Sequence, residues 1–161
     1  MRGFFRRRVA DPFLLLLKQG LAPEALALSL ALGATLGLFP VIGATTALCV
    51  VAGFALRLNH PALQLANYVV YPLQIPLILV FVRLGESIVG ATPMTVSAER
   101  LLASFRQDPL AFVARFSWTG LHGILGWLTV APLVCGALYA GLAPLLRHAT
   151  RRVAPAPASA A

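Results

Sequence analysis

The stretch GLFPVIG, residues 37–43, stands near the middle of 32 consecutive uncharged residues, 25–56. One helix needs about 20 apolar residues to cross a bilayer, so this run is too long for one crossing and too short for two. Proline removes a backbone donor and keeps the residue before it extended. The run therefore predicts two half-length helices, roughly 25–38 and 44–56. They would form a re-entrant hairpin, broken at Gly37, Pro40 and Gly43 inside the membrane.

The rest of the chain is as apolar as this run. Hydrophobic residues make up 59% of the sequence and charged residues 11%, and the mean hydropathy is +0.84. Soluble domains carry about 25% charged residues. Two further uncharged runs cover 58–82 and 116–146. A large soluble core is the alternative, but three such runs in 161 residues leave too little polar surface to cover it. The predicted fold class is all-α, a small multi-pass helical membrane protein.

The net charge of +8 comes mainly from arginine, which supplies twelve of the thirteen basic residues. These arginines flank apolar runs, so the positive-inside rule accounts for them and nucleic acid is not an expected partner. Clusters at both termini predict two cytoplasmic ends, with anionic lipid headgroups as partners. In this topology 58–82 crosses outward and 116–146 returns. If 58–82 is also re-entrant, the segment that joins it to 116–146 stays on the cytoplasmic side, but the C-terminal arginine cluster then lies on the outer side.

The predicted organisation is one membrane domain with short flanking segments. Residues 1–22 form a basic arm and an interfacial helix, and 148–161 form a basic segment followed by a disordered tail. The domain, 23–147, comprises the hairpin 25–56, a broken helix 58–82, an amphipathic connector 84–115 and a last membrane helix 116–146. Pro72 and Pro76 are expected to kink or break the second of these elements. Trp118 and Trp127 are interpreted as markers of the membrane interface.

Small residues recur every four positions in the first half of the hairpin. This ridge comprises Ala25, Ser29, Gly33 and Gly37. Such spacing lets helix backbones approach closely in lipid. The ridge predicts either static packing, which is the commoner case, or a surface along which another segment slides.

Polar side chains are spaced four, three, four and three residues apart in the second run. They are His60, Gln64, Asn67, Tyr71 and Gln74, and together they form one helix face, the polar stripe. Facing lipid would be costly, so the stripe should face the break at Pro40. Arg57, Asn59, Thr45 and Thr46 complete the candidate set for a polar path or substrate contact. The alternative is that the amides only hydrogen-bond the loose backbone of the hairpin.

Several motifs together resemble a bacterial membrane family known as domain of unknown function 2062. The motifs are Pro23-Glu24, residues 37–46, Arg57-Leu58-Asn59, Asn67, residues 71–74 and residues 83–86. The resemblance implies a multi-pass protein of the bacterial cytoplasmic (inner) membrane and implies no activity. The broken hairpin is also loosely similar to the re-entrant loops of DedA-type proteins, although it lacks their acidic residue.

Two functions from different classes follow. The first is a module that transports or translocates a small solute or lipid along the polar stripe. The second is a non-catalytic scaffold or accessory subunit for an envelope or lipid-pathway enzyme, with the ridge as its docking face. No catalytic set, metal cluster or phosphate loop is visible, so we expect no enzyme, metal or cofactor. A second copy of the chain is a further candidate partner, since it would cover the hairpin.

Overall fold

The computed structural model describes residues 22–41, 43–91 and 107–153, which are helical wherever they are regular. The elements are α3 (Pro23–Gly37), α4 (Ala44–Ala55), α5 (His60–Val89) and α7 (Pro109–Val153). The all-α class is therefore confirmed, and the two half-length helices agree with prediction within two residues. The predicted interfacial helix before residue 22, residues 92–106 of the predicted connector and the tail after Val153 lie outside the described residues.

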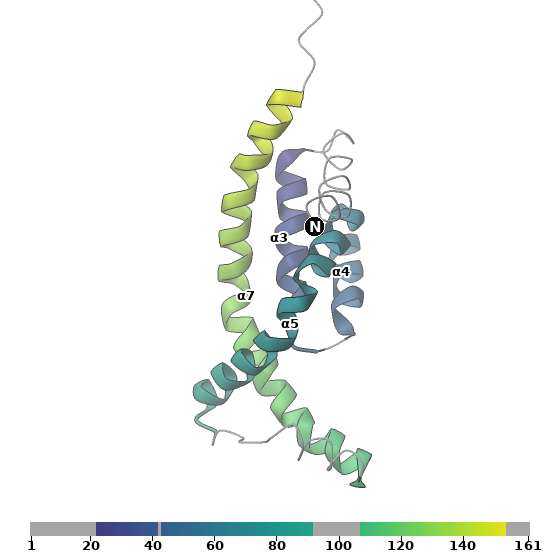
Figure 1. Ribbon diagram of the computed structural model, residues 1–161, viewed down its shortest axis with the longest axis vertical. Coiled ribbons are helices and arrows are strands. Elements are labelled where there is room, and N and C mark those ends of the chain that lie inside the picture. The colour runs from purple at the N-terminus through teal and green to yellow at the C-terminus, as the bar shows by residue number, and fades with distance from the viewer. Residues whose placement is uncertain (1–21, 42, 92–106, 154–161) are drawn as a thin grey trace, which may run out of the picture.

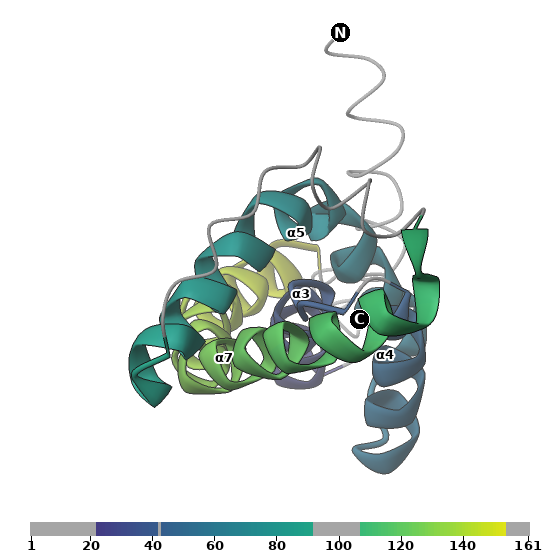
Figure 2. The same cartoon turned by 90° about the horizontal axis from the view of Figure 1, so that it is seen from below.

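Helix α3 is the central element of the bundle and contacts α4, α5 and α7 (Figure 2). It begins at Pro23, where the missing N–H removes no helical hydrogen bond, and Glu24 lies in the first turn. Helix α7 runs antiparallel to α3, since Glu24 contacts Arg147 and Thr35 contacts Trp127. Helix α5 runs parallel to α3, since Ser29 contacts Asn59 and Gly33 contacts Leu63.

The hairpin of α3 and α4 reaches only partway along the two longer helices (Figure 1). Its turn lies beside the middle of α5, at Gln74, and beside α7 at Trp127. A buried cluster of Phe81, Trp127 and Ala131 packs with Leu38 and Phe39 at this level. A second cluster lies toward the start of α3 and the end of α7. It comprises Leu26, Ala27, Leu30, Ala62, Ala66, Ala143 and Leu146.

Helix α5 is continuous from His60 to Val89, so the predicted end at residue 82 falls short by seven residues. The helix also stays regular across Pro72 and Pro76 and is bent rather than broken (Figure 1). Arg83 and Glu86 pair one turn apart at 3.3 Å, which suits continued helix. Helix α5 ends at Gly90, whose φ of 68° lies in the left-handed region that favours glycine.

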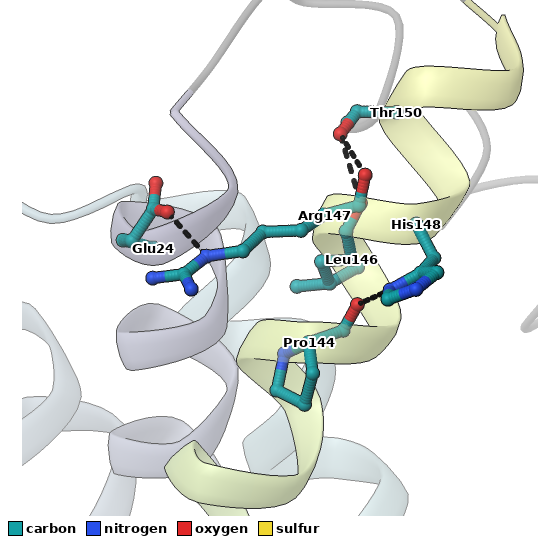
Figure 3. A network of polar contacts seen from close by, with 6 residues as sticks. All are labelled: Glu24, Pro144, Leu146, Arg147, His148 and Thr150. Atoms are coloured by element: carbon teal, nitrogen blue, oxygen red, sulfur yellow. Dashed lines mark hydrogen bonds and ion pairs between the residues drawn. The ribbon is translucent and has the colours of Figure 1, made fainter.

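Helix α7 is longer at both ends than the predicted 116–146. Pro109 opens it, which is a favourable first helical position. After residue 146 the helix continues, and polar side chains in its last turns contact carbonyls one turn back. His148 Nδ1 lies 2.8 Å from the Pro144 carbonyl, and the Thr150 hydroxyl donates to Leu146 at 2.9 Å (Figure 3). Residues 84–89 and 109–115 of the predicted connector are thus helix.

Two described helices are long and apolar enough to cross a membrane, His60–Val89 and Ser117–Thr150. Only 22% and 11% of their most apolar windows are buried. Their exposed side chains include Leu79 at 69% and Leu133 at 74%. The core helix of a soluble protein would be mostly buried, so this pattern favours an apolar surrounding.

Candidate functional site

The hairpin turn, described at residues 38–41 and 43, is the centre of the candidate site. It follows α3 through backbone bonds from Leu38 N–H to Thr35 at 3.2 Å and from Phe39 N–H to Leu36 at 3.0 Å. Gly43 has a φ of 88°, a conformation that side-chain-bearing residues rarely adopt, and it precedes α4 directly. Pro40 lies close to Gly123 of α7, since a Cβ on Gly123 would be in van der Waals contact with the proline ring at 3.4 Å. The predicted break is therefore a turn supported by α7.

Trp127 supports the end of α3 from α7. Its Nε1–H donates to the Thr35 carbonyl at 3.2 Å, and its ring meets Phe39 edge-on, with centroids 5.0 Å apart. The side chain is buried, whereas the interfacial tryptophan that was predicted would be exposed on the outer surface. The sequence carries no local signal for this role, because the contact joins residues 92 positions apart.

Gln74 supports the turn from α5. Its Nε2–H donates to the Phe39 carbonyl at 2.7 Å, which satisfies a backbone group that the proline leaves outside any helix. The side chain is completely buried. The other end of the amide differs, because Gln74 Oε1 is buried and has no hydrogen-bond partner among the described residues. The contact with the hairpin therefore explains the role of the Gln74 Nε2 group and leaves the role of its oxygen unexplained.

Asn67 repeats the pattern two turns earlier on α5. Gln64 Nε2–H donates to the Thr46 carbonyl at 3.3 Å, and Asn67 Nδ2–H donates to Gln64 Oε1 at 3.3 Å. This relay connects α5 to the start of α4. Asn67 is 1% exposed, and its Oδ1 again finds no partner within the described part of the chain. Among the described residues, the buried side-chain atoms without partners are thus two amide oxygens.

Close packing of α3 on α5 surrounds these oxygens. A Cβ on Gly33 would collide with the Leu63 carbonyl, and one on Gly37 would lie 2.9 Å from Asn67 Oδ1. The Ser29 hydroxyl donates to Ala25 at 2.7 Å and accepts the Asn59 N–H at 3.1 Å. Three members of the predicted ridge therefore form a seam with α5, whereas the Ala25 side chain is exposed.

The remaining stripe residues do not share the buried environment. His60 packs against Phe54 with the rings tilted and their centroids 4.5 Å apart, and its ring fills the space beside Gly53. Tyr71 is 46% exposed. The stripe thus divides into a buried pair, Asn67 and Gln74, and members that are half-buried or exposed. Outside the stripe, Asn59 caps α5 by accepting the Ala62 N–H at 2.9 Å.

The other predicted contacts are dispersed. The Thr45 side chain is buried and Thr46 is exposed. Arg57 is exposed in the turn before α5 and has a φ of 52°. Arg83 lies near the opposite end of α5, where it pairs with Glu86. Arg57 and Arg83 therefore cannot bind the same small anion. Within residues 22–41, 43–91 and 107–153, no group of three potential metal ligands is present.

The two buried oxygens can only accept hydrogen bonds. One N–H of each amide is donated to a carbonyl oxygen, whereas each amide oxygen has no partner among the described residues. A buried polar atom without a partner costs about 1–3 kcal/mol. Such a cost is commonly offset where water or a ligand supplies the missing bond.

Comparisons with known proteins give a family and nothing beyond it. A family model described as "Uncharacterized protein conserved in bacteria (DUF2062)" matches residues 4–154. Neither the curated proteins nor the solved structures contain a match. The loose likeness to DedA-type proteins stays a prediction.

Proposed function

The chain belongs to this family of bacterial proteins, and we propose that it is an inner-membrane module that moves a small solute or lipid past the hairpin turn. The observation that carries the proposal is the pair of buried oxygens, on Asn67 and Gln74, beside a turn at the middle of α5. Broken apolar segments that meet near mid-membrane are typical of transporter binding sites.

The lengths of the helices support a re-entrant hairpin. At about 1.5 Å per residue, α3 and α4 span about 22 Å and 18 Å, less than the hydrocarbon thickness of about 30 Å. Helix α5 spans about 45 Å by the same measure, enough to cross. In this proposal α5 crosses outward and α7 returns. The end of the bundle with Arg57 and Arg147 then faces the cytoplasm and anionic headgroups.

The scaffold alternative loses its predicted docking face. Gly33 and Gly37 of the ridge pack against Leu63 and Asn67 within the same chain, so that surface is not open to a partner protein. The proposal includes no catalytic step and no cofactor. A second copy of the chain that covers the outer face of α4 is compatible with it, since Val51 and Phe54 there are 64% and 73% exposed.

Cysteine accessibility tests the proposal. In a background with Cys49→Ala and Cys135→Ala, single cysteines replace Thr46, Asn67 or Gln74, and a membrane-impermeant thiol reagent probes each side. We expect labelling at all three positions, because water must reach a translocation path. Cysteines at the lipid-facing positions Leu79 and Leu133 are matched controls that should stay unlabelled. Labelling at an Asn59 control alone would mean that the buried pair is dry and would overturn the proposal.

A further inference from the structure

We propose that the solute is a small neutral molecule that presents O–H or N–H groups, of the polyol or urea type. This inference rests on the proposed translocation function and names the chemistry of its substrate. Asn67 Oδ1 and Gln74 Oε1 are its recognition atoms. Each is buried, and each has no hydrogen-bond partner among the described residues.

The orientation of both amides is fixed by their other ends. Gln74 Nε2–H donates to the Phe39 carbonyl, so a flipped amide would place oxygen against oxygen. Asn67 Nδ2–H donates to Gln64 Oε1, whose own amide donates to Thr46, so a flip of either amide breaks the relay. The two buried atoms that have no partner among the described residues are therefore acceptors, and a ligand that is complementary to them must donate hydrogen bonds.

The geometry disfavours a cation. Asn67 and Gln74 are seven residues apart, or about 10.5 Å along a helix, whereas hard cations gather several oxygens within about 2.6 Å. The acidic residues described on α3 and α5 are engaged elsewhere. Glu24 pairs with Arg147, and Glu86 pairs with Arg83. Two separated neutral oxygens suit two successive hydrogen bonds along a path better than one ion site.

The geometry also disfavours an anion. The first N–H groups of α4 could attract one. However, an anion on the path would meet the two buried oxygens, which repel negative charge and offer no proton. Arg57 is exposed at the distant turn before α5 and does not neutralise it.

The approach to Asn67 is tight, and this limits the size of the solute. Helix α3 comes this close to the Asn67 side chain because Gly37 has no Cβ. A Cβ there would lie 2.9 Å from Asn67 Oδ1 and 2.6 Å from Val70 Cγ2. Gly37→Ala therefore blocks the approach to this oxygen. Gly136→Ala is a matched control on α7, since a Cβ at Gly136 meets nothing within 4 Å among the described residues.

The test uses the full chain in proteoliposomes. Stopped-flow light scattering measures entry of glycerol and urea, and separate assays measure rubidium and formate entry. We expect glycerol and urea to enter faster than into protein-free vesicles, with no gain for either ion. Gly37→Ala should reduce glycerol entry at least about tenfold, the loss expected for one hydrogen bond near 1.4 kcal/mol. Gly136→Ala should leave it unchanged.

A second variant distinguishes hydrogen bonding of the solute to Asn67 from the effect of the width of the path. Asn67→Ala removes the free oxygen and adds room, so it should slow glycerol if the oxygen binds solute and speed it if the path is merely narrow. This readout holds if Gly37→Ala fails to fold. Rubidium or formate entry without glycerol or urea entry would overturn the neutral-donor inference and leave translocation standing. No entry of any probe, with unlabelled cysteines at Asn67 and Gln74, would overturn both.

Discussion

Trp127 and Trp118 are the same residue type with opposite surroundings. Trp127 is buried and donates its N–H to the Thr35 carbonyl, whereas Trp118 is 69% exposed. We expect Trp127→Phe to lower the free energy of unfolding by about 1 kcal/mol, because phenylalanine keeps the aromatic packing and loses the hydrogen bond. Trp118→Phe should change it by less than about 0.5 kcal/mol. Denaturant unfolding in detergent micelles, followed by circular dichroism, gives both values. Equal effects would contradict the assigned role.

Residue-level roles divide into those that a local pattern reveals and those that it does not. Asn67 and Gln74 were identifiable because their spacing places them on one helix face, which predicts a shared environment. Tyr71 lies on the same face and is nevertheless 46% exposed. Periodicity predicts the side of the helix on which a residue lies, and it does not predict which element packs against that side. Trp127 was misread, since the backbone carbonyl it serves is known only once α3 and α7 are docked.

At the scale of elements, the seam between α3 and α5 depends on glycine. A Cβ on Gly33 would collide with the Leu63 backbone, which cannot rotate away as a side chain can. We expect Gly33→Ala to destabilise the fold by about 1–3 kcal/mol through overpacking. The Gly136→Ala control should be neutral or slightly stabilising, since alanine favours helix. Steric-trapping or denaturant assays measure the difference, and an equal response of the two variants would exclude the close seam.

Element types were more predictable than element ends. The uncharged run with a central proline predicted the α3–α4 hairpin closely, because half-length helices and a break have strong local causes. The ends of α5 and α7 were misjudged because charged residues were interpreted as boundaries. In the structure Arg83 pairs with Glu86 within the helix, and the last turns of α7 bond their own carbonyls. Charge marks the edge of an apolar run, which is not the edge of a helix.

At the scale of the whole molecule, the ion pair of Glu24 and Arg147 joins the first described helix to the last at 2.6 Å (Figure 3). A hydrogen bond from its own backbone and then the Arg147 guanidinium lower the pKa of Glu24 below its ordinary 4.5. A lowered folded-state pKa stabilises the fold above the unfolded value, and this contribution is lost as the pH falls through the folded value.

We therefore expect Glu24→Gln to reduce stability at pH 7 more than at an acidic pH below the lowered pKa of Glu24, where the wild-type carboxylate takes up its proton. The effect should be small and salt-sensitive, since both side chains are about half exposed. Unfolding of wild type, Glu24→Gln, Arg147→Gln and the double variant at both pH values isolates the coupling. A coupling independent of pH would show that the pair does not act through its charge.

The separation of these partners along the chain bears on biosynthesis. Glu24 and Arg147 are 123 residues apart, and Thr35 and Trp127 are 92 apart. At about 5–20 residues per second, the ribosome completes the second partner of the ion pair about 6–25 s after the first. Because Trp127 precedes Arg147 in the chain, the nascent hairpin has neither its tryptophan brace nor its ion pair for most of that interval. In the proposed membrane setting, we expect insertion machinery or lipid to shelter the exposed turn until the last helix arrives.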